Sequence, residues 1–128
     1  MNLAIRQERV EDYELTERVV KSAFANAEQS DKTEHKLVSR IRKSNAFISN
    51  LSLVAINKDN HQILGHVLLS KIKIINDNQV AESLALAPVS VLPEFQNKGV
   101  GRLLILEALK EAKELGFNSV VVLGHPEY

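Results

Sequence analysis

One stretch decides the fold: Val91-Leu92-Pro93-Glu94-Phe95-Gln96-Asn97-Lys98-Gly99-Val100-Gly101-Arg102. An apolar strand ends at a proline, a glycine-rich loop follows, and the loop leads directly into an amphipathic helix of about residues 99–115. The first N–H groups of a helix have no partner within it, and the helix dipole adds partial positive charge there. The two glycines lack a Cβ, so an anion can approach the main chain closely. The stretch therefore predicts a phosphate-binding loop.

Two common phosphate-binding motifs do not fit this loop. A P-loop needs Gly-x-x-x-x-Gly-Lys-Ser/Thr, whereas Lys98 precedes the glycine pair and no Ser or Thr follows it. A dinucleotide-binding loop needs Gly-x-Gly-x-x-Gly, and Leu104 occupies the place of its third glycine. The ligand must therefore be identified from the sequence around the loop.

Hydrophobic periodicity predicts a mixed α/β fold in one domain over residues 1–128, a length sufficient for a single core. We expect, in chain order, a strand, two helices, three strands, a helix and a strand. The first strand covers residues 3–6 and the first helix residues 11–25. The second helix starts within residues 30–34. The later elements are expected at residues 51–56, 62–75, 80–92, 99–115 and 119–123.

Two of these strands carry special features. Pro88 interrupts the strand at residues 80–92, and because proline cannot donate a ladder hydrogen bond, it predicts a bulge or local splaying. Residues 119–123 form a continuous apolar run, which is typical of a strand buried in a parallel pair. With the helix at residues 99–115 between them, these strands predict a right-handed βαβ unit.

Composition excludes several classes of function. Sixteen basic and sixteen acidic residues cancel, so the charge excess of a nucleic-acid-binding protein is absent. Four scattered histidines and no cysteine argue against a metal site and exclude disulfides. No apolar run is long enough for a signal peptide or a membrane span. We therefore expect a cytoplasmic protein that contacts neither nucleic acid nor membrane.

The segment Gln96-Asn97-Lys98-Gly99-Val100-Gly101 resembles the Gln/Arg-x-x-Gly-x-Gly/Ala pyrophosphate loop of the GNAT acetyltransferase superfamily. Residues 89–95 are similar to that family's Val-x-Pro-x-Tyr/Phe lead-in, and the likeness is strongest over residues 84–123. The resemblance implies the GNAT fold. It also implies acetyl-CoA as cosubstrate, without a metal, and a primary amine of a small molecule or peptide as acceptor.

The resemblance further implies the cofactor-binding residues. Main-chain groups around Ser90 and Val91 would hold the pantetheine arm. The pyrophosphate would lie against the loop and helix start formed by Gln96, Asn97, Lys98, Gly99, Val100, Gly101 and Arg102. With no cysteine available to carry the acyl group, direct transfer in a ternary complex is the simpler scheme.

The catalytic assignments are less constrained by the motif. Glu82 lies on the strand leading to the thioester site and is the first candidate for the general base, with a surface carboxylate as the alternative. The resemblance implies an acid tyrosine just past the strand at residues 119–123, which makes Tyr128 the candidate acid that protonates the thiolate, with a loop tyrosine as the alternative. His66 and Ser83 are interpreted as strand residues without a role, and Tyr13 as helix packing.

Two main functions remain open from the sequence: an acetyl-CoA-dependent N-acetyltransferase, and a non-catalytic acyl-CoA-binding module or sensor. A nucleotide-phosphate binder is a third alternative, which ATP competing better than CoA would support. GNAT domains usually continue with another helix and further strands, so the resemblance implies a domain that is incomplete at its C-terminus. The sequence leaves the oligomeric state open, and a sheet edge left unpaired there would favour pairing with a second copy as a homodimer.

Overall fold

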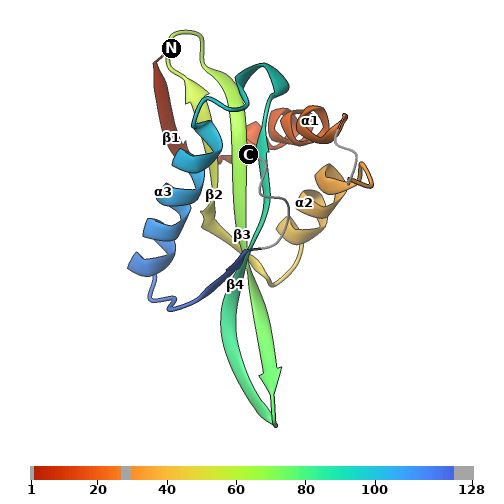
Figure 1. Ribbon diagram of the computed structural model, residues 1–128, viewed down its shortest axis with the longest axis vertical. Coiled ribbons are helices and arrows are strands. Elements are labelled where there is room, and N and C mark those ends of the chain that lie inside the picture. The colour runs from red at the N-terminus through yellow and green to blue at the C-terminus, as the bar shows by residue number, and fades with distance from the viewer. Residues whose placement is uncertain (1, 27–29, 123–128) are drawn as a thin grey trace.

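A five-stranded sheet with helices on both faces forms the protein (Figure 1). The structure is a computed structural model that describes residues 2–26 and 30–122. The strands run in the order β1-β2-β3-β4-β5, and only the β4–β5 pair is parallel. Their bounds are β1 Leu3–Gln7, β2 Phe47–Asn57, β3 Gln62–Asn76, β4 Gln79–Val91 and β5 Val120–Val122.

Two helices cover one face of the sheet and one helix covers the other (Figure 1). The pair on one face is α1 (Tyr13–Phe24) and α2 (Glu34–Arg42), and the single helix is α3 (Val100–Glu114). Short 3-10 turns precede two of them: η1 (Val10–Asp12) before α1 and η2 (Pro93–Phe95) before the glycine-rich loop. The predicted order of elements is confirmed, and the predicted GNAT fold matches this arrangement.

Side chains along β3 alternate between the two faces of the sheet, so the core forms two layers. Val67 and Leu69 pack with Leu104 in the layer under α3, whereas Leu68 packs with Val20 and Val38 under α1 and α2. Because successive side chains of a strand point to opposite faces, one strand supplies both layers. The apolar run of β3 therefore places it at the centre of the molecule.

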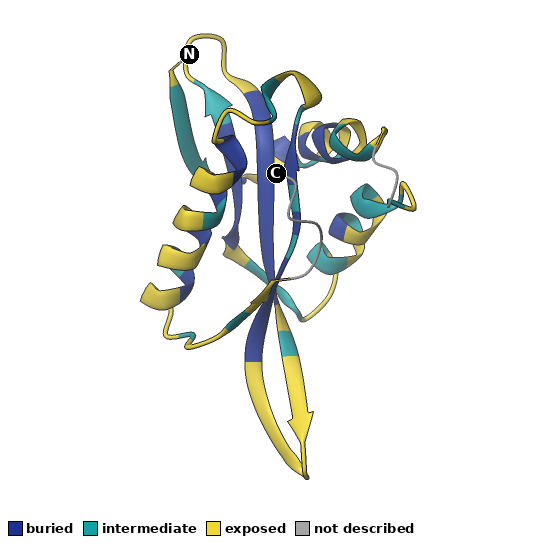
Figure 2. Ribbon diagram, in the orientation of Figure 1, coloured by how far each residue is buried: buried dark blue, intermediate teal, exposed yellow. Residues whose placement is uncertain are grey.

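The hairpin of β3 and β4 extends beyond the rest of the sheet. In the described sheet, residues 72–76 and 79–83 pair only with each other, and we call them the ribbon. Figure 2 shows the ribbon almost entirely exposed, and Ile75 is 75% accessible. Pairing of this sheet with a second copy stays a prediction.

The predicted burial of the last strand is wrong for its described residues. β5 pairs in parallel with β4 as expected, but Val122 is 61% exposed. The physical reason is position: β5 is the edge strand of the described sheet, so one side of it has no neighbour there.

The bulge predicted at Pro88 is confirmed. Val67 faces Val89 and Leu69 faces Leu86, so two residues of β4 oppose one residue of β3. Such a bulge bends its strand and locally disrupts the ladder. It separates the half of β4 that pairs with β5 from the half that leads to the glycine-rich loop.

Gly65 allows β4 and α3 to lie close to β3 at this level. A Cβ at this position would be 2.8 Å from the Ser90 carbonyl oxygen and 3.0 Å from Leu104 Cδ1. Substituting Gly65→Ala should therefore lower the free energy of unfolding by about 1–3 kcal/mol, as overpacked cores do. Urea denaturation measures the loss. Ala81→Val adds carbon at an exposed position of β4 and should cost less than about 0.5 kcal/mol; equal losses would contradict the close contact at Gly65.

Candidate functional site

The last residues of β4 present an open main-chain edge. Among the described residues, β4 pairs with β5 only from Leu84 to Leu86. Leu92 N–H donates to Leu64 O at 2.9 Å, and hydrogen bonding alternates along an antiparallel pair, so the main chain of Ser90 also faces β3. The main chain of Val91 then faces the opposite, open side. There its carbonyl accepts a hydrogen bond of 2.9 Å from Gln96 Nε2.

The glycine loop, residues 96–101, connects this edge to α3. Asn97 has φ +63° and Gly99 has φ +85°, both in the left-handed region that favours asparagine and glycine. Apart from Gly99 itself and its two chain neighbours, no described residue has a heavy atom within 4 Å of where a Cβ on Gly99 would stand. Helical bonding begins with Leu103 N–H, which donates to Gly99 O at 3.1 Å. The N–H groups of residues 100–102 therefore have no partner within the helix.

The charge around the loop suits an anion. Lys98 and Arg102 are exposed on either side of the glycines, and the first turn of α3 contains no acidic residue. Lys98 Nζ lies 5.7 Å from the centre of the Phe95 ring, which keeps its stem beside the loop. Free N–H groups, the helix dipole and two cations together make a cradle for phosphate groups.

The structure brings together the nine residues that the sequence assigns to cofactor binding. All of them lie at the end of β4, in the glycine loop or in the first turn of α3: Ser90, Val91, Gln96, Asn97, Lys98, Gly99, Val100, Gly101 and Arg102. Two features differ from the expected detail. The Gln96 side chain bonds to Val91, and the main chain of Ser90 faces β3 and not the open edge.

The structure does not bring the candidate catalytic residues to this edge. Glu82 is exposed on the ribbon, where its cross-strand partner is Lys73. The strand from Glu82 to Ser90 spans roughly 25 Å at about 3.3 Å per residue. Tyr128 lies outside the described residues.

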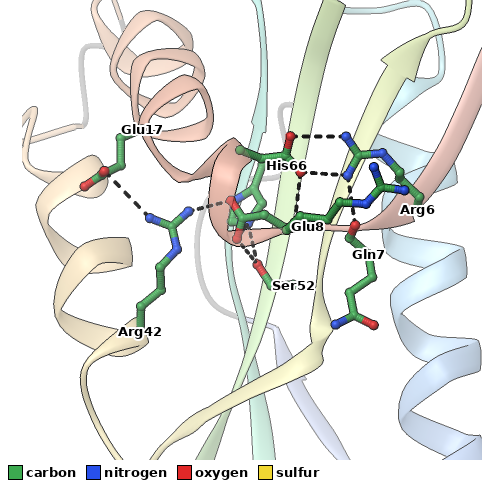
Figure 3. A network of polar contacts seen from close by, with 9 residues as sticks. Arg6, Gln7, Glu8, Glu17, Arg42, Ser52 and His66 are labelled. Carbon is green, nitrogen blue, oxygen red and sulfur yellow. Dashed lines mark hydrogen bonds and ion pairs between the residues drawn. The ribbon is translucent and has the colours of Figure 1, made fainter. Parts of the chain in front are cut away.

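A second polar feature lies under α1 and α2, where Glu8, Arg42, Ser52 and His66 form the buried polar cluster (Figure 3). Arg42 Nη2 is 2.5 Å from Glu8 Oε2, and the two side chains are 6% and 0% exposed. Ser52 Oγ donates to Glu8 Oε1 at 2.7 Å and lies 2.9 Å from His66 Nε2. The ring of Tyr13 covers the Arg42 guanidinium at 4.0 Å. The cluster joins the residue that follows β1 to α2, β2 and β3.

Burial dominates the electrostatics of His66. It lowers the pKa of this imidazole to about 4, although Glu8, with an oxygen 3.8 Å from Nε2, acts in the opposite direction. His66 is therefore neutral near pH 7. At the rim of the cluster, the hydrogen bond from Arg6 holds the pKa of Asp12 below its usual value.

Sequence reasoning missed this cluster, in which His66, interpreted as a strand residue without a role, is a buried and hydrogen-bonded member. Its members are far apart in the chain, and each alone resembles a surface residue. One signal was available: Ser52 and His66 are polar residues inside two apolar strands, where an unpaired polar group is costly.

An open depression lies between α1 and α2. The residues lining it are Glu17, Asp31, Thr33, His35, Lys36, Ser39 and Arg40. Within residues 2–26 and 30–122, no cluster of three His, Cys, Asp or Glu side chains is arranged for a metal ion. No helix in the same ranges has the length and apolar character required to span a bilayer.

The sequence matches a family model described as Acetyltransferase (GNAT) family over residues 5–127. Two similar curated proteins are the uncharacterized N-acetyltransferases YjhQ and YhbS of Escherichia coli K12. YjhQ is 29% identical over 83% of this chain and 55% of its own length. YhbS is 32% identical over 73% of this chain and 53% of its own. The chain thus spans about half the length of these relatives.

Two solved structures have the same fold at higher coverage. A GNAT family acetyltransferase from Brucella melitensis, in complex with acetyl-CoA, is 31% identical with a TM-score of 0.84, over 99% of this chain and 79% of that one. Escherichia coli YhbS, in complex with CoA, is 27% identical with a TM-score of 0.82, over 98% and 64%. Because the family model covers nearly the whole sequence, this chain belongs to the GNAT family of acetyltransferases.

Proposed function

We propose that this protein is an N-acetyltransferase that moves an acetyl group from acetyl-CoA to a primary amine. One observation carries the proposal: the glycine loop and the free N–H groups of α3 adjoin the open main-chain edge of β4, held there by the Gln96–Val91 hydrogen bond. The acetyl-CoA complex of the Brucella melitensis relative supports the choice of ligand.

Each part of the site has a task in this proposal. The N–H groups of residues 100–102, with Lys98 and Arg102, bind the diphosphate. The outward main chain of Val91 pairs with the amide-containing pantetheine arm of acetyl-CoA, as one strand pairs with another. Bound acetyl-CoA supplies an activated thioester, and in the transfer a C–N bond to the amine forms while the C–S bond breaks. A backbone N–H at this edge is suited to the developing oxyanion.

A second candidate is a non-catalytic acyl-CoA-binding module. The observation that favours it is the distance of Glu82 from the open edge, which leaves the deprotonation of the amine without an assigned base. Acetyl-CoA binding by calorimetry and CoA release with a panel of small amines and peptides separate the two. Saturable binding with amine-dependent release supports the transferase; binding without release supports the module, and absence of binding contradicts both.

The proposed role of the glycine loop in binding diphosphate can be tested by substitution. Gly101→Asp places a carboxylate beside the free N–H groups of α3, so acetyl-CoA should bind about 100-fold more weakly or worse. The matched control is Gly116→Asp beyond the other end of α3, where a side chain has open space and the same charge is far from the loop.

Thermal melting of both variants identifies any loss of folding, because Gly101 is buried and Gly116 has φ +92°. Lys98→Glu, at an exposed position of the loop, provides a second variant that leaves the core untouched. Unchanged affinity in folded Gly101→Asp and Lys98→Glu proteins would contradict the placement of the diphosphate.

A further inference from the structure

His66 connects the buried polar cluster to the strand that carries the site. Its cross-strand partner in β4 is Ser90, and directly opposite residues lie on the same face of a sheet with Cβ atoms about 5 Å apart. That face is the one under α1 and α2, because a Cβ on the neighbouring Gly65 would point at α3. The buried polar cluster therefore extends as far as β3, the strand next to β4, and β4 carries the open edge.

The direction of the hydrogen bonds in the cluster is determined by its proton count. Ser52 has one hydroxyl proton, and it is donated to the Glu8 carboxylate at 2.7 Å. Ser52 Oγ must then accept at its 2.9 Å contact with His66 Nε2, so Nε2 carries the proton. In a neutral imidazole, the other nitrogen is an acceptor. His66 Nδ1 therefore presents a lone pair.

Two buried atoms on this face have complementary hydrogen-bonding capacity. His66 Nδ1 and Ser90 Oγ are both buried without a hydrogen-bond partner among the described residues. Leaving either atom unpaired is costly, whereas a hydroxyl donor and an imidazole acceptor satisfy each other. Rotation of the Ser90 side chain about χ1 selects which neighbour its hydroxyl meets. The other buried atoms in this condition are Thr16 Oγ1 and Arg42 Nε.

We propose that His66 is a positioning residue for acetyl-CoA binding, accepting a hydrogen bond from the Ser90 hydroxyl at Nδ1 and so holding the open edge of β4. This inference rests on the proposed function. Ser90 lies between Val89 and Val91, directly after the bulge that separates this part of β4 from the part that pairs with β5. Glu8, anchored by Arg42, holds Ser52, and Ser52 holds the ring of His66. Ser90 is 1% exposed, so its side chain acts through the strand and not by touching substrate.

Two histidine substitutions separate the two sides of the ring. The amide of Gln reaches the position of Nε2, so His66→Gln keeps the bond to Ser52 and loses the acceptor for Ser90. The amide of Asn lies near Nδ1, so His66→Asn keeps an acceptor for Ser90 and loses the bond to Ser52. We expect His66→Gln to weaken acetyl-CoA binding about fivefold, and His66→Asn to weaken it less.

A double-mutant cycle tests the contact itself. Ser90→Ala alone should weaken acetyl-CoA binding about fivefold, and adding it to His66→Gln should cause no further loss, because the contact is already absent. The control is Ser83→Ala, which removes another buried hydroxyl of β4, one bonded to Ser119. It should change affinity less than about twofold and add independently to His66→Gln. Additive effects of the His66 and Ser90 substitutions would overturn the proposal.

A spectroscopic readout does not depend on acetyl-CoA, and its first part needs only the unmodified protein. The ¹⁵N chemical shifts of the His66 ring in the unmodified protein should report a neutral ring protonated at Nε2. The Nδ1 resonance should move in Ser90→Ala and stay unchanged in Ser83→Ala. A proton on Nδ1, or no response to Ser90→Ala, would refute the contact. If the protein does not bind acetyl-CoA while the ring shows the expected chemical shifts, the proposed function is contradicted and the contact between His66 Nδ1 and the Ser90 hydroxyl is supported.

Discussion

Arg42→Met should lower the free energy of unfolding by about 3–5 kcal/mol, because it leaves the Glu8 carboxylate buried without its partner. The Glu8 side chain is 0% exposed and lies 2.5 Å from Arg42 Nη2, so its carboxylate is shielded from bulk water. The substitution also removes the cation stacked on Tyr13 and the longer contact of 3.8 Å to Glu17. Urea denaturation at pH 7 measures the effect.

The matched control is Arg18→Met in the exposed pair with Glu14. That pair has a similar distance of 2.8 Å, but its side chains are 70% and 81% exposed. Exposed pairs on one helix contribute only about 0.3–0.5 kcal/mol, because water and salt screen them. Near-equal losses for Arg18→Met and Arg42→Met would show that the buried pair is not a strong contact.

A double variant tests whether the penalty comes from the unpaired charge. Glu8→Gln removes the charge but keeps an oxygen that accepts from Ser52. Glu8→Gln combined with Arg42→Met should therefore be more stable than Arg42→Met alone. A double variant that is no more stable would place the loss in packing, through the contact with Tyr13.

Acid should destabilise the protein through His66 well before its carboxylates are protonated. The imidazole has a pKa of about 4 when folded, against about 6.5 in an unfolded chain. Below pH 6.5 the unfolded state thus binds the proton more readily. The stability contributed by neutral His66 is complete above pH 6.5 and is lost as the pH falls towards 4. The loss amounts to about 3 kcal/mol over that window.

The measurement is the free energy of unfolding from pH 7.5 to 4.5 for the unmodified protein and for His66→Gln. The difference between the two curves isolates His66, because the other titrating groups are common to both. Asp12, with its lowered pKa, also stabilises the fold above its unfolded pKa of about 3.9, but that loss occurs at lower pH. Parallel curves between pH 6.5 and 4.5 would contradict the burial of a neutral imidazole.

The local sequence pattern was sufficient to predict the order of the helices and strands and the position of the glycine loop. The periodicity of the helix after Gly99, the alternation along β3 and the interruption at Pro88 are each contained in a short window of sequence. The free N–H groups of α3 follow from its being a helix, whatever it packs against. For that reason the predicted anion cradle and the family could be read from about forty residues.

Other features depend on which residues lie close together in space, and only the tertiary structure determines these. It put Glu82 on the ribbon, far from the open edge, because strand register and length determine where a residue of β4 lies. It also left β5 exposed at the edge of the described sheet. The buried polar cluster joins residues 8, 42, 52 and 66, whose meeting depends on how α2 packs on the sheet. Local sequence determined which elements form and where we propose that phosphate binds, because those properties arise within a few residues. The polar contacts beneath the strand required the folded chain, because burial makes each one strong and no local pattern encodes its partner.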